Sequence, residues 1–198
     1  MRRALPVALL VLVLVLAGCG SGSSHGLTNV SVNTSASADR GQKTFSAKGM
    51  SIHFLFPDSF RVIQLTQIRH TAGKTRGASK AAIGIGPLDL LVIAHYPGAL
   101  RRPLTRALLA PTRRYFNALI SKLAGRSMSG VFKSLDGRYA LVYPPIPVSG
   151  LPAPVTAQVV NVFDGRDEYE LQCQATAAGL ARIKEACAEA VGTMTFSP

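Results

Sequence analysis

The sequence predicts an α+β fold in which an antiparallel β-sheet is flanked by helices. Short apolar or alternating segments bounded by turn residues recur along the chain, which is the pattern of β-strands. Two Asp-Gly pairs separate neighbouring strand patterns, as in hairpins. Two longer segments, 103–124 and 177–191, carry apolar residues at helical spacing. Because strands and helices occur in separate runs, the antiparallel α+β class is the simplest prediction.

The first half of the folded part is predicted to contain three strands. They cover residues 50–56, 60–65 and 88–96, with 60–65 either a separate strand or the continuation of the first, and Pro-Asp or Pro-Gly pairs follow the first and the third. The stretch between the second and third strands, 69–86, is polar, basic and rich in Gly. We therefore predict it to be a loop.

The helix predicted over 103–124 is amphipathic. At about 100° per residue, its apolar face carries Leu104, Leu108, Tyr115, Leu119 and Leu123, with Phe116 and Ile120 beside them, and its other face carries Arg106, Arg113 and Arg114. Pro111 lacks a backbone donor, so we expect a kink here, or two short helices with Pro111 in the first turn of the second.

The second half is predicted to form two hairpins, a helix and a last strand. The hairpins pair 131–135 with 138–142 and 156–163 with 168–174, the helix covers 177–191, and the last strand covers 193–196. Gly at each hairpin turn accepts the positive φ that a tight turn needs. The Pro-rich segment 143–152 is predicted to be an exposed connector or a stiff loop that a protein partner recognises.

The N-terminus has the three-part pattern of a secretory signal peptide. Arg2 and Arg3 precede an apolar run over 7–17. As a helix this run covers about 16 Å, roughly half of the hydrocarbon core of a bilayer, so it is too short for a permanent span. The lipobox-like residues Leu16, Ala17, Gly18 and Cys19 follow, and they imply lipidation of Cys19 and cleavage just before it. An ordinary signal peptide with a chance Cys at the cleavage site is the alternative.

Three parts of the chain are therefore predicted. Residues 1–18 are a lipoprotein signal peptide, 19–42 are the lipidated Cys and a flexible polar tether, and 43–198 are a single globular domain. The tether is rich in Gly, Ser and Thr and cannot bury enough apolar surface to order itself. Two or three acyl chains on one residue give stable anchoring. The predicted location is the outer face of a bacterial cell membrane.

The positive charge is concentrated in one block. Removal of residues 1–18 lowers the net charge from +12 to +10, and residues 61–126 contain twelve basic residues and one acidic residue. From this block we select as candidate anion-binding residues Lys74, Arg76, Lys80, Arg106, Arg113 and Arg114. The expected partner is an anionic lipid or envelope polymer near the membrane, and a merely solvated surface is the alternative. Nucleic acid is not expected, because no aromatic residues interleave with the basic loop.

No motif for catalysis, a cofactor or a metal is found. Gly73-Lys74-Thr75 lacks the first Gly of a phosphate loop, because Ile68 stands at that position. The acidic residues Asp164, Asp167, Glu168 and Glu170 cluster at a predicted hairpin, and a solvated turn is favoured over a cation site or an acid/base pair. We predict a binding or accessory role and no enzyme activity. The alternatives are a small envelope hydrolase or transferase and a structural subunit of a membrane complex.

Two cysteines remain once Cys19 is assigned to the lipid. Cys173 lies on a predicted strand and Cys187 on the following helix. An even pair in an oxidising, exported compartment predicts a disulfide, with two buried thiols as the alternative.

Several of these features together resemble a known family. They are the lipobox and polar tether, the segment SIHFLFPDSF at 51–60, two hairpins, the cysteine pair and the closing TMTFS. The chain resembles small actinobacterial exported lipoproteins with a PsbP-like α/β/α sandwich, the LpqN type. The resemblance implies this sandwich for residues 43–198 and an accessory or binding role, with no catalytic residues to transfer.

Overall fold

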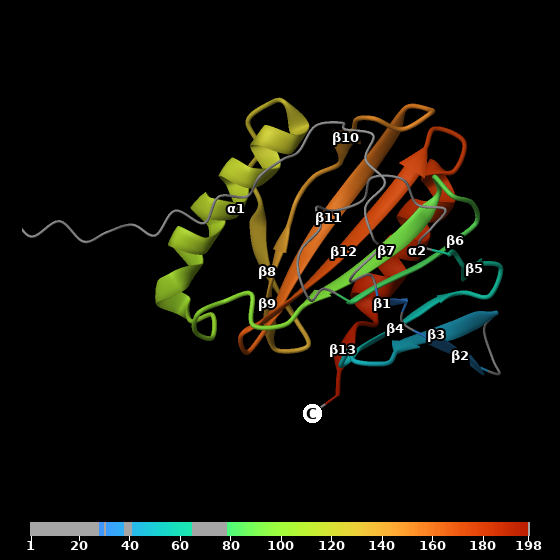
Figure 1. The fold of residues 1–198 in the computed structure, drawn as a ribbon, viewed down its shortest axis with the longest axis horizontal. Coiled ribbons are helices and arrows are strands. Elements are labelled where there is room, and N and C mark those ends of the chain that lie inside the picture. Colours follow the sequence, from blue (N-terminus) through green and yellow to red (C-terminus); the bar gives the residue numbers. More distant parts are fainter. Residues whose placement is uncertain (1–27, 30, 38–40, 65–78, 198) are drawn as a thin grey trace, which may run out of the picture.

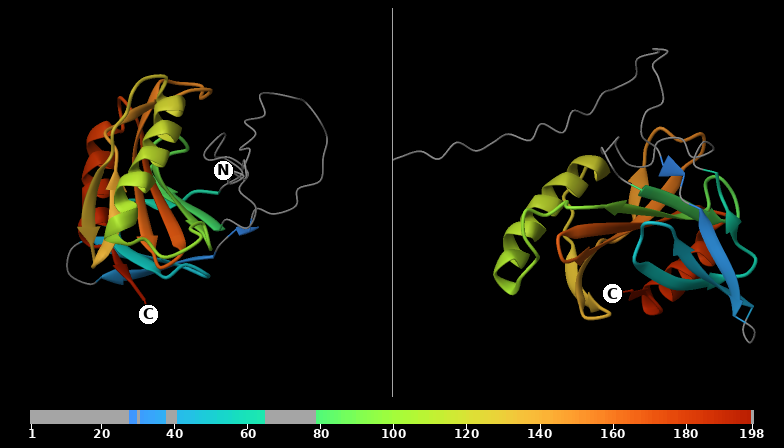
Figure 2. Two further views of the ribbon diagram at one scale, coloured as in Figure 1. Left: turned by 90° about the vertical axis from the view of Figure 1, so that its left-hand side faces the viewer. Right: turned by 60° about the horizontal axis from the view of Figure 1, so that its bottom comes forward.

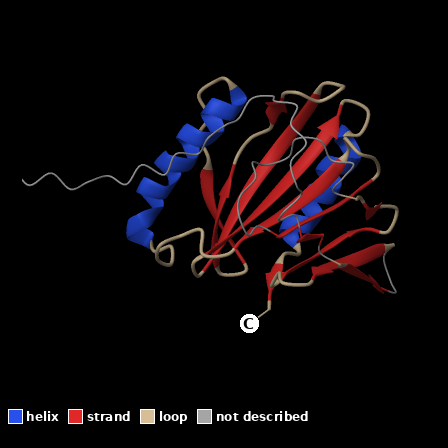
Figure 3. Cartoon of the chain, viewed as in Figure 1, coloured by secondary structure: helices blue, strands red, loops and turns tan. Residues whose placement is uncertain are grey.

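The computed structural model describes residues 28–29, 31–37, 41–64 and 79–197. This part of the chain forms two β-sheets and two α-helices (Figures 1 and 3). All strand pairs are antiparallel except one, so the predicted α+β class with an antiparallel sheet and flanking helices is confirmed. The predicted signal peptide and lipobox, including Cys19, lie outside the described residues.

The larger sheet has nine strands, and its main order is β1-β6-β7-β12-β11-β9-β8. In chain order its strands are β1 Thr28–Asn29, β5 Arg61–Val62, β6 Ser79–Gly84, β7 Leu90–Tyr96, β8 Val131–Leu135, β9 Arg138–Val142, β10 Ile146–Val148, β11 Val155–Asp164 and β12 Asp167–Thr176. The short strands β5 and β10 pair with β6 and β11. The smaller sheet has the order β13-β4-β3-β2, with β2 Val32–Ser37, β3 Gln42–Ala47, β4 Ile52–Pro57 and β13 Thr195–Phe196.

The main core lies between one face of the large sheet, helix α2 (Leu180–Gly192) and the small sheet. Alternate residues of β12, such as Leu171 and Cys173, point to this face and meet Ile183 of α2. In the small sheet, the rings of Phe45 and Phe54 stack with centroids 4.6 Å apart.

Helix α1 (Leu109–Ala124) covers the opposite face of β9 and β11. Phe116 and Ile120 are its buried residues, and they pack on Leu141, Val159 and Phe163. In Figure 1, α1 lies at one end of the molecule beside β8, and the right-hand view of Figure 2 also shows it apart from the small sheet. A 3₁₀ turn, Arg106–Leu108, precedes α1, and Pro111 falls in its first turn, as in the second of the two predicted arrangements.

Both predicted hairpins are confirmed. In the β8–β9 turn, Asp136 and Gly137 have φ of 47° and 74°, and Gly165 in the β11–β12 turn has φ of 60°. Glycine reaches this region without steric cost, which explains why the Asp-Gly signal identifies the turns.

Strand pairing begins earlier than predicted. The segment 19–42 was expected to be a tether, yet β1 and β2 lie within it, and β2 pairs with β3 from Val32↔Ala47 to Ser37↔Gln42. The tether prediction is therefore wrong for these strands. Backbone hydrogen bonds to a neighbouring strand stabilise such a segment even where its side chains are small and polar.

Three further predictions need correction. The loop predicted over 69–86 contains β6, whose small residues Ala81 and Ala82 carry no clear period of hydrophobicity. The strand predicted over 60–65 is only Arg61–Val62. Part of the predicted Pro-rich connector is the strand β10, and Ile146 in it is buried. A short strand at the edge of the sheet tolerates Pro147, so the proline does not prevent this pairing.

The buried face of α1 is also rotated from the predicted one. Tyr115 and Leu123 were placed on the apolar face of the first helix, but they are 64% and 51% exposed. Packing on the sheet centres the buried stripe of α1 on Phe116 and Ile120 instead.

Candidate functional site

A polar row crosses the face of the large sheet that lies opposite α2. The register aligns Lys80 with Ala94, Ala94 with Glu170, and Glu170 with Asn161. We call Lys80, Glu170 and Asn161 the polar row. Ala94 has only a methyl group, so the long side chain of Lys80 can approach Glu170 across it.

Burial shifts the pKa values of the charged side chains on this face. It lowers the pKa of Lys80, against the opposing effect of Glu170, and it raises the pKa of Glu170, against the effect of Lys80. Glu168 lies two residues before Glu170 on the same face of β12. Burial is the main cause that raises the pKa of Glu168 to about 8, and the nearby Glu170 is the second. The carboxyl of Glu168 is therefore mainly protonated at neutral pH, and it can donate a hydrogen bond or hold a proton.

Amide side chains complete this face. Gln172 Nε2 donates to Gln174 Oε1 at 3.4 Å, and Gln174 Nε2 donates to the Leu88 carbonyl at 3.2 Å. Asn161 is 1% exposed, and its Nδ2 is the buried side-chain polar atom that has no hydrogen-bond partner within the described ranges. An unsatisfied buried donor costs about 1–3 kcal/mol, so a stabilising role in the fold does not explain the amide of Asn161.

The sequence prediction for the acidic hairpin was only half correct. Asp164 and Asp167 lie at the turn, where each accepts a hydrogen bond from a basic side chain, whereas Glu168 and Glu170 point onto the sheet face. The alternation of apolar and polar residues in 168–174 indicates that these glutamates share a face. It does not indicate that β7 and β11 lie on either side of β12 and place Ala94 and Asn161 next to Glu170.

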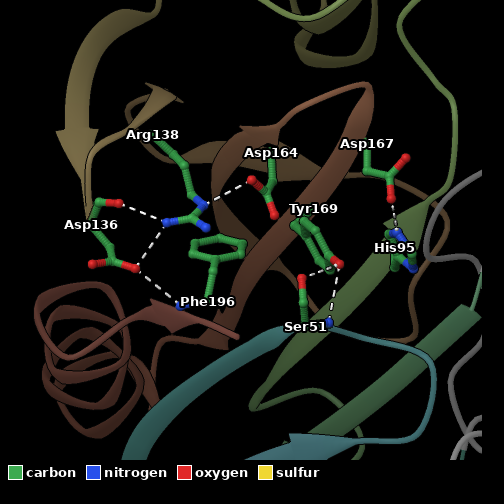
Figure 4. A network of polar contacts seen from close by, with 8 residues as sticks. All are labelled: Ser51, His95, Asp136, Arg138, Asp164, Asp167, Tyr169 and Phe196. Atoms are coloured by element: carbon green, nitrogen blue, oxygen red, sulfur yellow. Dashed lines mark hydrogen bonds and ion pairs between the residues drawn. The ribbon is translucent and has the colours of Figure 1, made fainter. Parts of the chain in front are cut away.

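A second polar network links β12 to the start of β4 (Figure 4). The Tyr169 hydroxyl lies 2.9 Å from Ser51 Oγ and accepts a hydrogen bond from the Ser51 N–H at 3.2 Å. His95 contacts the Gly49 carbonyl through Nδ1 and Asp167 through Nε2, both at 3.0 Å. Because neither ring nitrogen bonds to Ser51, these residues do not form the relay that activates a serine nucleophile.

Arg138 links both hairpins to Phe196 of β13 (Figure 4). Its Nε donates to Asp164 Oδ1 at 2.9 Å and its Nη1 to Asp136 Oδ2 at 3.1 Å. The guanidinium lies 4.5 Å from the ring centroid of Phe196, whose N–H donates to Asp136 at 3.1 Å. These residues form a structural clasp, because each of their charged groups has a partner within it.

The predicted disulfide is confirmed. Cys173 of β12 and Cys187 of α2 are bonded, and they join the large sheet to the helix that covers its core face.

The candidate anion-binding residues that the structure describes do not form one patch. Lys74 and Arg76 lie outside the described residues. Lys80 is only 6% exposed in the polar row, so its prediction as a surface ligand is wrong, because β6 is an inner strand and its side chains are covered. Arg106, Arg113 and Arg114 are exposed on the 3₁₀ turn and α1, at the opposite end of the sheet.

The segment around α1 carries a concentration of exposed basic side chains. We call its exposed basic side chains the basic helix surface; they are Arg101, Arg102, Arg106, Arg113, Arg114, Lys122 and Arg126. The sequence contains no acidic residue from position 90 to position 135. The charge of this surface is therefore not compensated from within its own segment.

Side-chain hydrogen bonds fix α1 on the sheet. Asn117 Oδ1 accepts from the Tyr143 hydroxyl at 2.8 Å and from the Gly130 N–H at 2.9 Å. Ser121 Oγ accepts from the Met128 N–H at 2.8 Å. The helix ends where Gly125 adopts a φ of 65°. The part of the basic helix surface that lies on α1 is thus presented on a rigid element.

Within the described ranges, no group of three or more His, Cys, Asp or Glu side chains is placed to hold a metal ion. In the same residues, no helix has both the length and the apolar character that crossing a bilayer requires.

No protein-family model matches the chain, and a search of curated proteins finds no relative. Solved structures with a similar arrangement include a protein of Bacteroides thetaiotaomicron, with a TM-score of 0.47 and 7% identity over 75% of this chain and 46% of that one. The chain therefore spans less than half of that protein. Mycobacterium tuberculosis LpqN, described as involved in cell envelope biogenesis, has a TM-score of 0.48 and 14% identity over 85% and 92% of the two chains. Synechocystis PsbP (CyanoP) has a TM-score of 0.45 and 11% identity over 90% and 98%. These similarities concern the fold, and we take no functional argument from them.

Proposed function

We propose that this protein is a lipid-anchored envelope protein with a binding role and no catalytic activity, and that it binds anionic groups at the basic helix surface. The observation that carries the proposal is the set of seven exposed basic side chains in a segment without acidic residues. The lipobox-like residues ending at Cys19 support the anchor and the envelope location.

The physical basis of the binding is electrostatic. Each Lys or Arg near an anionic membrane surface contributes about 1 kcal/mol. Arginine also binds phosphate oxygens in pairs, through the planar fork of its guanidinium. An anchor at residue 19 would keep this surface close to the head groups of the membrane, so that weak individual contacts act at a high local concentration.

The second candidate is a small hydrolase or transferase, and Glu168 is the observation in its favour. A carboxyl with a pKa of about 8 is suited to acid/base chemistry at neutral pH. However, Lys80 and Asn161 in the neighbouring polar row are 6% and 1% exposed. Glu168 itself is half-buried, but the neighbouring polar side chains that could assist it are closed to substrate, which favours a role without turnover.

The test uses the unlipidated chain from residue 19, with Cys19→Ser, and sedimentation with vesicles. We expect binding to phosphatidylglycerol vesicles and none to phosphatidylcholine vesicles. Arg106→Gln, Arg113→Gln and Arg114→Gln together should weaken the apparent affinity about 100-fold, from about 1 kcal/mol per residue. Raising the salt to about 1 M should also release the protein, because the Debye length falls to about 3 Å.

The matched control removes three exposed cations elsewhere, with Arg61→Gln, Arg182→Gln and Lys184→Gln. It has the same net charge as the first triple variant and should retain most of the binding. Equal loss in the two variants would mean that net charge alone acts, and unchanged binding by the first variant would refute the proposed surface.

A further inference from the structure

Four rows of side chains run along α1, and three of them form strips of different chemistry. Residues four apart lie on one side of a helix, about 40° from each other. The first strip, Phe116 and Ile120, is buried against the sheet. The second is basic and consists of Arg114, Ala118 and Lys122, all exposed. The third consists of Tyr115, Leu119 and Leu123, and it adjoins the basic strip because Ala118 and Lys122 lie three residues after Tyr115 and Leu119, about 60° around the helix.

The third strip is apolar although it faces solvent. Tyr115 is 64% exposed, the highest value for a large apolar side chain in the described ranges, and Leu123 is 51% exposed. Leu119 between them is half-buried. The Tyr115 ring meets Phe116 edge to face, with centroids 5.4 Å apart, so the ring is supported at the helix surface. The basic strip and the exposed apolar strip therefore belong to one rigid helix.

A soluble polyanion would interact favourably with the basic strip only. Binding to it gains nothing from an exposed tyrosine and leucine beside the cations. A bilayer uses both strips, because anionic phosphates lie next to a region that accepts apolar side chains, and Tyr is favoured at this boundary. The combination of strips favours a lipid surface over a soluble polymer.

We propose that α1 lies against a bilayer of anionic phospholipids, with Arg114 and Lys122 at the phosphates and Tyr115 and Leu123 in the head-group region. This inference rests on the proposed function and narrows its ligand to the lipid surface. The helix lies on the membrane and does not cross it: its buried strip stays on the sheet, which leaves one outer side for the lipid.

The chain offers a direct reporter, because it contains no Trp. Tyr115→Trp places a single indole on the apolar strip of the unlipidated chain. We expect a blue shift of its emission on phosphatidylglycerol vesicles and quenching by brominated acyl chains, with no such change on inorganic polyphosphate. Leu180→Trp, at an exposed position on α2, is the control and should show neither effect.

A second measurement removes the apolar strip. Tyr115→Ser with Leu123→Ser should weaken partition onto phosphatidylglycerol vesicles about tenfold and leave polyphosphate binding unchanged. Val62→Ser with Leu180→Ser removes two other exposed apolar side chains and should change neither. Thermal melting of each variant checks that the fold is retained.

The outcomes separate the two proposals. If the arginine variant loses binding while the Tyr115 and Leu123 variant binds vesicles normally and the indole emission does not shift, the bilayer inference is overturned and the anionic binding role stands. If the unmodified sequence binds neither vesicles nor polyphosphate, the proposed function fails as well.

Discussion

The imidazole of His95 lies flat against the phenol ring of Tyr169, with centroids 4.4 Å apart and planes 5° apart. The two residues are direct partners in the β7–β12 register. Tyr169 reaches Ser51 on one side, and His95 reaches Asp167 on the other. This stacked pair therefore links the small sheet to the β11–β12 turn through the core, and each of its contacts can be removed separately.

Tyr169→Phe should destabilise the protein by about 1–3 kcal/mol, because it leaves the Ser51 N–H without its acceptor. Ser51→Ala keeps that N–H bond and loses only the Oγ contact, so it should cost about 1 kcal/mol or less. Urea unfolding followed by circular dichroism measures both values. A larger loss for Ser51→Ala than for Tyr169→Phe would contradict this account.

Asp167→Asn should make stability less sensitive to acid. Burial acts to raise the pKa of Asp167, but hydrogen bonds from the Gly98 N–H and His95, with the charges of His95 and Arg166, lower it below 3.8 overall. The carboxylate therefore stabilises the fold above the pKa of the unfolded chain, and this contribution is lost as pH falls through the native pKa. Unfolding free energies of the two proteins should differ near neutral pH and converge in acid. A constant difference at every pH would refute the assigned cause.

Glu168→Gln should act in the opposite pH range. Its pKa rises from 4.5 to about 8 on folding, so the native state holds this proton more tightly than the unfolded chain. The stabilisation that this raised pKa provides is fully present below pH 4.5 and is lost as the pH rises towards about 8. The unfolding free energy should fall by at most about 1.4 kcal/mol per pH unit over this range. The variant should flatten the decline of stability across this range. If the decline persists unchanged in both Glu168→Gln and Glu170→Gln, the two carboxyls are not its source.

Replacement of Cys173 and Cys187 together by Ala should lower the unfolding free energy by about 3 kcal/mol in the chain-entropy model of loop closure. Binding to anionic vesicles should be retained where the variant is folded, because the disulfide joins β12 to α2, whereas the basic helix surface lies on α1 and the residues next to it. Urea midpoints and vesicle sedimentation test the two parts. Equal midpoints before and after reduction of the native protein would contradict the stabilising role.

Local patterns predicted much of the fold. The two hairpins follow from Asp136-Gly137 and Asp164-Gly165, because a tight turn needs a residue that tolerates positive φ. The strands around Ile52, Leu91 and Leu171 follow from their hydrophobicity. Strands β2, β6 and β10 could not be predicted in this way, since partners elsewhere in the chain hold their backbones and their side chains carry little periodic signal.

The candidate sites depended more strongly on tertiary structure. The excess of basic residues in 61–126 is a property of the sequence, but Lys80 from this block lies buried beside Glu170, whereas Arg114 lies exposed on α1. Likewise, Glu168 follows directly after Asp167, yet one points onto a sheet face and the other to the turn.

Local signals predict the fold class, the turns and the cysteine pair, because periodicity, glycine conformation and an even cysteine count are local or compositional properties. Which charges are buried, and which side of α1 meets the sheet, depend on tertiary packing. The side of a helix or strand that is covered depends on the elements that pack against it. These elements are distant in the chain, and no spacing within one segment specifies them.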